Sequence, residues 1–292
     1  MRINFAKYDG AGNDFVMVDD LAGSIELDAE TVTRICDRHF GVGADGVIVA
    51  RQSPREECLA FMDYWNSDGT KAEMCGNGVR CFAKFLDDSG LTGGADSLVA
   101  DTPAGPKPLD LVRGGSGAVE SVRVDMGEPV LDPTRVPTTL AANHKSGAAA
   151  EVPITMRGKA YFFTCISMGN PHAIAFVDED VAKLPLETIG PLYESHEVFP
   201  ARANIEFAHV EGDDIWMRVW ERGCGETLAC GTGSCATAVA AHITGRAGRR
   251  VNVHVLGGTL EIEWAEDNHV LMCGPASRNW EGVLDTDEIC AS

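Results

Sequence analysis

The sequence predicts two similar domains in one chain, each built from strands and a helix. Three observations lead to this expectation. The chain has 292 residues, enough for two ordinary domains of roughly 100–200 residues each. Its composition, 45% hydrophobic and 23% charged, is that of a globular protein. Motifs of the first half also recur in the second half at a nearly constant spacing.

The first half alternates turn signals with apolar segments. Glycine and asparagine over 10–14 predict a loop, and the apolar residues from Phe15 to Val18 predict a strand. Beyond Gly78, apolar residues at 79, 82, 83 and 86 have helical spacing. Between these elements we expect a helix over Asp28–Arg38, a glycine-rich loop over 40–46, and strands over Val47–Ala50 and Leu59–Trp65.

A domain boundary is expected in the segment Glu128–Pro153. It contains four prolines and a run of Ala, Gly, Thr and Ser, a composition that commonly joins domains. The expected domains are therefore residues 1–127 and 128–274. The second half then repeats the order of the first, in Gly169–Phe176, Phe199–Phe207, Trp216–Trp220 and a helix beyond Cys230.

The spacing of the repeated features supports a duplication. Cys75 and Cys230 lie 155 residues apart, and so do Asn66 and Glu221, which end the two Trp-containing strands. The two Gly-Asn pairs lie 157 residues apart, and the segments that begin at Phe40 and Phe199 lie 159 residues apart. Chance matching in a glycine-rich sequence is the alternative, but four ordered matches near one spacing favour duplication.

Charge and hydropathy exclude several classes of function. A formal charge of −20 repels phosphate backbones and anionic lipid surfaces, so we expect neither nucleic-acid nor membrane binding. The N-terminal residues MRINFAKYDG lack the apolar region of a signal peptide, and no segment approaches the ~20 apolar residues of a membrane span. We expect a cytoplasmic protein.

The ten cysteines do not form a disulfide or zinc pattern. A reducing compartment disfavours disulfides, and there is no C-x-x-C pair and no common zinc-finger spacing. We therefore expect no structural metal. Most of the thiols are expected to be buried as small hydrophobic side chains.

Two of the cysteines stand in matching Cys-Gly-x-Gly turns, Met74–Arg80 and Ala229–Cys235. Glycines let backbone amides approach a ligand closely, and the following helix offers unpaired N–H groups and a positive dipole end. Such a helix start favours thiolate over thiol and can hold a carboxylate. A lone Cys-Gly-x-Gly is more often a tight turn with a buried thiol, so the paired occurrence carries the argument.

Paired thiols suit the inversion of a stereocentre. If the two halves face each other across a pseudo-twofold relation, two acid/base groups flank one carbon. One thiolate removes a proton from one face while the other thiol donates a proton to the opposite face, and the reverse reaction swaps the roles. Backbone amides stabilise the charge that develops on the α-carboxylate, so no cofactor is expected.

The residues around these turns resemble the diaminopimelate epimerase family, which interconverts LL- and meso-diaminopimelate in lysine and cell-wall precursor synthesis. The resemblance covers nearly the whole chain. It runs through Lys7–Phe15, Gly41–Gly46, Asn66–Gly69, Met74–Cys81, Gly169–His172 and, most specifically, Glu221–Gly233.

The resemblance implies an α+β fold of two pseudo-symmetric domains, each a mostly antiparallel β-sheet curled around a central helix. It also implies that residues 275–292 return to the first domain, that the protein is a homodimer, and that it needs no cofactor.

The resemblance further implies a role for each candidate site residue. Cys75 and Cys230 are the acid/base pair, and Glu221 takes the reacting ammonium. The reacting carboxylate is bound by amides of Gly76, Asn77, Gly231 and Thr232; Asn13 and His172 line the reacting end; Asn66, Asn170, Asn204 and Arg222 bind the distal amino-carboxylate end. The plainer alternatives are a surface carboxylate for Glu221, a satisfied loop histidine for His172, and asparagines that bond their own turns.

Two departures from the family pattern are the extra thiol of Cys224 and a longer tail from Trp280 to Cys290. Two other functions stay open at this point. One is a racemase of the same fold that acts on another amino acid, such as histidine or proline. The other is a noncatalytic zinc- or redox-binding protein that uses the cysteines.

Overall fold

The computed structural model describes residues 1–72 and 74–291, and for residues 288, 290 and 291 it describes the backbone alone. The side chain of Cys290 therefore lies outside the described residues. Contacts within the chain divide it into two compact units. Unit 1 comprises Met1–Val124 and the segment from Gly274 onward, and unit 2 comprises Asp125–Cys273.

Unit 1 contains a strand that the sequence analysis does not expect, β1 (Arg2–Gly10), followed by β2 (Asn13–Asp20). Its other strands are β3 (Gly46–Arg51), β4 (Ala60–Asn66), β5 (Ser97–Asp101), β6 (Lys107–Arg113), β7 (Val119–Asp125) and β17 (Ser277–Asp285). From β1 to β7, each strand pairs with the next one along the chain, and β17 pairs with β1. These pairings are antiparallel except for β2 with β3 and β4 with β5.

Unit 2 repeats this topology. Its strands are β8 (Val152–Met156), β9 (Lys159–Ser167), β10 (Pro171–Phe176), β11 (Asn204–Glu211), β12 (Asp214–Glu221), the short β13 (Gly225–Thr227), β14 (Arg250–Val255), β15 (Gly258–Trp264) and β16 (Val270–Pro275). Again two pairings between long strands are parallel, β10 with β11 and β12 with β14. In unit 2 the strand beside β9 is β8. In unit 1 the equivalent strand, beside β1, is the C-terminal β17.

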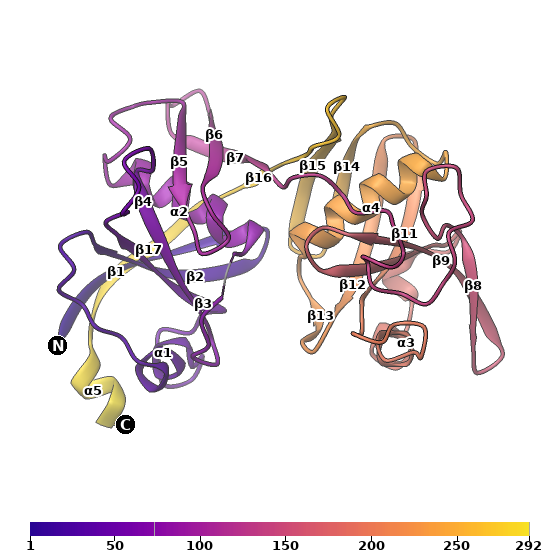
Figure 1. The fold of residues 1–292 in the computed structure, drawn as a ribbon. Helices are drawn as coiled ribbons and strands as arrows, with labels where there is room; N and C mark the ends of the chain where they lie inside the picture. Colours follow the sequence, from indigo (N-terminus) through magenta and orange to yellow (C-terminus); the bar gives the residue numbers. More distant parts are fainter. Residues whose placement is uncertain (73, 292) are drawn as a thin grey trace. The chain divides into compact units, whose positions relative to one another are not determined.

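Each unit has one helix enclosed by its strands (Figure 1). In unit 1, α2 (Gly76–Asp88) packs against β1, β2, β3, β5, β6 and β17, and in unit 2, α4 (Gly231–Ile243) packs against β9, β10, β11, β12, β14 and β15. Both helices have 13 residues, and their starts lie 155 residues apart. The expected α+β fold, with mostly antiparallel sheets around central helices, is confirmed.

The remaining helices lie outside the two enclosed positions. They are α1 (Ala29–Cys36), α3 (Leu186–Glu194), α5 (Thr286–Ala291) and a 3₁₀ turn at Val181–Lys183. The Asp28 side chain begins α1 by accepting a hydrogen bond from the Thr31 amide at 2.8 Å, the usual N-cap interaction. In the described part of the chain, no helix combines the length and the apolar character needed to cross a membrane.

Strand β3 shows how the core of unit 1 is organised around α2. Val47 and Val49 pack with Val32 and Ile35 of α1. The side chain of Ile48, which points to the opposite face of the sheet, reaches Gly78 in α2. Because β3 is covered on both faces, its apolar residues are continuous, as the sequence shows for Val47–Ala50.

Candidate active site

Cys75 is the N-cap residue of α2, with φ −136° and ψ 123°. Its Sγ accepts a hydrogen bond from the Gly78 amide at 3.4 Å, and the side chain is half-buried. The thiol therefore stands at the unpaired amides of a helix start, as the Cys-Gly-x-Gly turn predicts.

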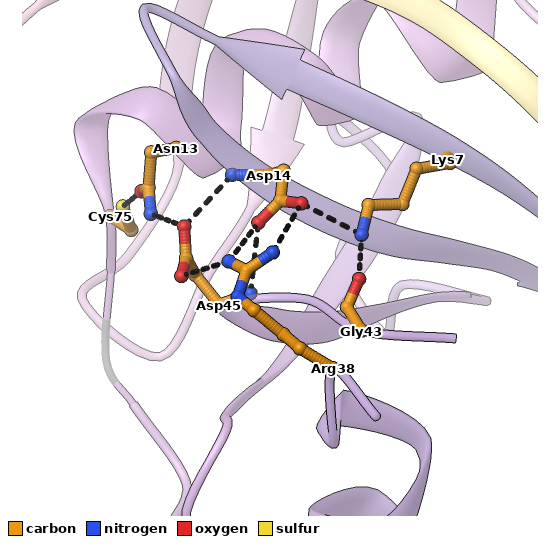
Figure 2. A network of polar contacts seen from close by, with 7 residues as sticks. All are labelled: Lys7, Asn13, Asp14, Arg38, Gly43, Asp45 and Cys75. Carbon is orange, nitrogen blue, oxygen red and sulfur yellow. Dashed lines mark hydrogen bonds and ion pairs between the residues drawn. The ribbon is translucent and has the colours of Figure 1, made fainter. Parts of the chain in front are cut away.

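Asn13 lies beside Cys75 because of a tight hairpin turn between β1 and β2. Ala11 and Gly12 both have positive φ, 56° and 80°, the conformation that a two-residue hairpin requires. Asn13 then begins β2, and its Oδ1 lies 3.7 Å from the Cys75 Sγ (Figure 2). The structure thus brings together two of the predicted site residues that are 62 positions apart.

The other predicted residues of unit 1 are held within their own turns. Gly76 and Asn77 form the first turn of α2, where the buried Asn77 accepts a hydrogen bond from Arg80 at 3.0 Å. Asn66 ends β4 and donates to the Thr70 hydroxyl at 3.0 Å.

Cys230 has the equivalent position in unit 2, as the N-cap residue of α4, with φ −128° and ψ 108°. Its Sγ lies 3.5 Å from the Thr232 hydroxyl, and Gly231 begins the helix. Cys230 is only 6% exposed.

The environment of Cys230 favours the neutral thiol. Burial, followed by the negative charges of Glu221 and Glu206, raises the pKa of Cys230 well above its ordinary value. The bonds from Thr232 and Gly233 oppose this rise but do not cancel it. The expectation that the helix start favours a thiolate is therefore wrong for Cys230, because desolvation outweighs the helix start.

Glu221 ends β12, and its Oε1 accepts a hydrogen bond from the Thr227 hydroxyl. Burial raises the pKa of this carboxyl group, while the Thr227 bond and the nearby His172 lower it. The side chain is thus held inside unit 2, near Cys230 and His172. A free surface carboxylate, the plainer alternative, does not describe it.

His172 is completely buried in β10 and is bonded through both ring nitrogens. Its Nδ1 lies 2.6 Å from Glu206 Oε1, and its Nε2 lies 2.9 Å from Asn170 Oδ1. Glu206 is also completely buried, and its Oε2 has no hydrogen-bond partner among the described residues. A buried carboxylate beside a histidine is a candidate for a functional site, and no motif in the sequence singles out Glu206.

Asn204 and Arg222 are linked to each other. The Asn204 side chain donates to the Pro171 carbonyl at 2.9 Å and accepts from the Arg222 amide at 2.8 Å. The exposed Arg222 guanidinium donates to the Ala201 carbonyl at 3.2 Å.

The remaining thiols behave as the composition predicts. Of the nine cysteines with described side chains, most are buried. Cys224 is exposed in the turn between β12 and β13. Among the described residues, no group of three or more His, Cys, Asp or Glu side chains has a geometry that could hold a metal ion.

Comparison with known proteins identifies the family. The family model for diaminopimelate epimerase matches residues 5–131 and 164–279. A diaminopimelate epimerase of Leptospira biflexa is 46% identical over 98% of this chain and 100% of its own length. Diaminopimelate epimerase 1 of a Nostoc species is 48% identical over 97% of this chain and 100% of its own length.

Solved structures share the fold at low sequence identity. A phenazine biosynthesis protein of the PhzF family from Bacillus anthracis has a TM-score of 0.70 at 19% identity, with 98% of this chain and 99% of that chain covered. A probable proline racemase from Agrobacterium radiobacter has a TM-score of 0.68 at 13% identity, with 97% and 93% covered. With the matched helix starts and the full-length similarity to curated relatives, the chain belongs to the diaminopimelate epimerase family.

Proposed function

We propose that this protein is a cofactor-independent isomerase that epimerises LL-2,6-diaminopimelate to meso-diaminopimelate, for lysine and peptidoglycan precursor synthesis. The observation that carries the proposal is the pair of N-cap cysteines, Cys75 and Cys230, on matching central helices of a chain in this family. We propose that the two units are the two epimerase halves, 1–127 with 275–292 and 128–274. Their contact-based bounds agree with these ranges to within a few residues.

In the proposed reaction, one cysteine thiolate takes the α-proton and the carbon keeps the electron pair. The thiol of the other cysteine gives its proton to the opposite face of that carbon, so protons and charge balance. The reverse reaction exchanges the two roles. The high pKa of Cys230, caused by burial and by Glu221 and Glu206, supports Cys230 as the protonated partner before substrate binds.

The negative charge that develops on the reacting carboxylate needs hydrogen-bond donors already in place. Gly76 and Asn77 in α2, with Gly231 and Thr232 in α4, are the proposed donors. Each pair occupies the first turn of its helix, directly after the cysteine, where backbone amides lack helical partners. This position lets the amides bind the carboxylate that is attached to the α-carbon, the atom from which one thiolate removes a proton and to which the other thiol adds one.

The proposed substrate contacts divide between the two ends of diaminopimelate. Glu221 takes the reacting ammonium, and Asn13 and His172 line the reacting end. Asn66, Asn170, Asn204 and Arg222 bind the distal amino-carboxylate end. The planar guanidinium of Arg222 suits a carboxylate, and the Asn204 bond to its backbone amide holds the base of that side chain.

Isotope exchange tests the proposal directly. LL-diaminopimelate incubated with the protein in deuterated water, without added cofactor, should give meso product labelled at the α-carbon. The absence of both exchange and meso product would refute the function. Cys75→Ser and Cys230→Ser should each lose most epimerisation, because serine is a far weaker acid than cysteine, and normal turnover by either variant would exclude the two-base scheme.

A second candidate is a racemase that acts on another amino acid, since the fold is shared with a probable proline racemase. A substrate panel separates the two candidates. Turnover of histidine or proline, which lack a distal amino-carboxylate end, would favour the racemase. A noncatalytic zinc- or redox-binding role instead predicts bound metal or redox cycling without turnover of any of these amino acids.

We also propose a cytoplasmic homodimer that acts on a free small molecule and binds neither nucleic acid nor membrane. The charge of −20 supports the last part of this proposal. Sedimentation equilibrium should give twice the chain mass of 31.2 kDa, and a monomeric mass at the concentration of the activity assay would argue against the dimer.

A further inference from the structure

A network of charged and polar side chains lies beside the β1–β2 hairpin and reaches Cys75 through Asn13 (Figure 2). We call it the Asp45 network; its members are Lys7, Asn13, Asp14, Arg38, Gly43 and Asp45. Strands β2 and β3 run parallel with Phe15 opposite Gly46, so the residues just before them, Asp14 and Asp45, lie side by side. The Asp45 amide donates to the Asp14 carbonyl at 2.9 Å.

The two carboxylates are held by cations on both sides. Arg38 donates to both Asp14 oxygens, at 2.8 and 3.2 Å, and to Asp45 Oδ1 at 2.8 Å. The buried Lys7 ammonium lies 2.8 Å from Asp14 and also donates to the Gly43 carbonyl. Because Arg38 binds Oδ1 of Asp45, the orientation of the Asp45 carboxylate is fixed, and its other oxygen, Oδ2, faces Asn13.

Asp45 Oδ2 determines how the Asn13 amide is turned. It accepts hydrogen bonds from Asn13 Nδ2 at 2.6 Å and from the Asp14 amide at 3.0 Å. An ionised carboxylate can only accept, so the NH₂ group of Asn13 must face Asp45. The carbonyl oxygen of Asn13 therefore faces the Cys75 Sγ, at 3.7 Å, and it can only accept a hydrogen bond from the S–H group.

We propose that Asp45 is a positioning residue that acts through Asn13 to hold and orient the S–H proton of Cys75. Its catalytic consequence rests on the function proposed above. The Gly78 amide, which donates to the same sulfur at 3.4 Å, stabilises the thiolate instead. Each protonation state of Cys75 therefore has one favourable contact, the Asn13 oxygen for the thiol and the Gly78 amide for the thiolate, as a group that serves as acid in one direction and base in the other requires.

The network belongs to unit 1 alone. In unit 2 the matching parallel strands pair His172 with Asn204, so the positions of Asp14 and Asp45 are occupied by Pro171 and Ala203. Neither residue can supply a carboxylate, and the Cys230 sulfur contacts the Thr232 hydroxyl instead of an asparagine oxygen. The duplicated backbone thus carries different proton-positioning groups at its two cysteines.

Alkylation of Cys75 tests the proposal without any use of epimerase activity. The full chain is treated with iodoacetamide across a range of pH, and modification of Cys75 is followed by peptide mass mapping. In Asp45→Asn the Asn13 amide can turn its NH₂ group toward the sulfur and stabilise the thiolate. We expect alkylation at pH 7 to be about 3- to 10-fold faster, with the midpoint of the pH profile lower by about 0.5–1 unit.

Two matched variants separate orientation from charge. Asp14→Asn removes one negative charge from the same network but leaves the Asp45–Asn13 bond in place, so its shift should be much smaller. Asp63→Asn, whose carboxylate is paired with Arg51 at 3.0 Å and with Lys71 in the same unit, should give no shift. An equal shift in Asp14→Asn would attribute the effect to charge and overturn the positioning role.

A double-mutant cycle shows whether Asp45 acts through Asn13. Asn13→Ala removes the accepting oxygen and should also lower the midpoint, and Asp45→Asn should then add nothing to it. An unchanged midpoint in Asp45→Asn, or shifts that add in the double variant, would overturn the proposal. If circular dichroism shows that Asp45→Asn does not fold, Asn13→Ala decides alone, and a wild-type midpoint there refutes the proposal. If the wild-type protein did not epimerise diaminopimelate, the proposed function would be refuted, but the alkylation of Cys75 could still be measured. A failure of the proposed function can therefore be distinguished from a failure of the positioning role of Asp45.

Discussion

Replacing the second glycine of each Cys-Gly-x-Gly turn with alanine should destabilise the protein clearly in unit 2 but little in unit 1. Gly78 and Gly233 are equivalent, each the third residue of its central helix. A Cβ on Gly78 would meet the methyl ends of Ile48 and Met62 at 3.1 and 3.2 Å. A Cβ on Gly233 would meet Glu206 Oε1 at 2.7 Å and the Cys230 sulfur at 3.3 Å.

The neighbours decide the free-energy change. Alanine in a helix gains about 1 kcal/mol over glycine in both variants. The methyl ends of Ile48 and Met62 can give way by a few tenths of an ångström, so Gly78→Ala should change the free energy of unfolding by less than about 1 kcal/mol. Glu206 is fully buried and bonded to His172 at 2.6 Å, so moving it weakens a charge-assisted bond worth about 1.5–3 kcal/mol.

Overpacking itself costs a further ~1–3 kcal/mol, so Gly233→Ala should lose about 1.5–5 kcal/mol after the helix gain of about 1 kcal/mol is subtracted. Urea unfolding followed by circular dichroism measures both variants against wild type, and an unchanged slope shows that stability alone has changed. If Gly233→Ala proves as stable as wild type, or Gly78→Ala loses more, the rigid placement of Glu206 beside α4 is refuted.

Two further outcomes follow from the charges of the site. Glu221→Gln should lower the pKa of Cys230, because the Glu221 charge is, after burial, the largest cause of the raised pKa. Iodoacetamide at pH 9 should then modify Cys230 several-fold faster than in wild type. The control variant Glu226→Gln should leave the rate of modification unchanged. Burial alone would raise the pKa of Asp14, but Arg38 and Lys7 overcome it and lower that pKa to about 2. The ionised carboxylate therefore stabilises the fold above about pH 4, and this contribution, ~2 kcal/mol, is lost as the pH falls toward 2. Acid unfolding of Asp14→Asn should lack that loss, and an acid profile identical to wild type would contradict the ion-pair assignment.

Local signals were enough to predict the helix starts and several strands. The Cys-Gly-x-Gly turns predict where α2 and α4 begin, and apolar runs predict β3 and β4, because these features depend on neighbouring residues. Strand β1 is different: Lys7 lies within it and is 4% exposed. A buried lysine breaks the apolar pattern, and its burial is explained by the ion pair with Asp14 at 2.8 Å and the hydrogen bond to the Gly43 carbonyl.

Contacts made by strand pairing could not be predicted from the sequence. Glu206 reaches His172 because β10 and β11 run parallel with His172 opposite Asn204, which puts Glu206, two residues further along, on the same face. Asp45 reaches Asn13 through the equivalent pairing of β2 with β3. Both carboxylates lie outside the resemblance-based assignments, since neither was expected to contact substrate.

Duplication explains the shared N-cap position of the two cysteines, and divergence of the side chains around them explains why their surroundings differ. Each helix start presents the same amides to its sulfur, but Cys75 is half-buried beside a fixed amide oxygen, whereas Cys230 is buried near two carboxylates. A two-base reaction begins only when one sulfur carries a proton and the other does not. The raised pKa of Cys230, caused by burial and by the charges of Glu221 and Glu206, suits Cys230 to the protonated role in the proposed reaction. Because the Glu221 charge contributes to the raised pKa of Cys230, the ammonium that Glu221 is proposed to bind would lower that pKa and ease proton release from Cys230.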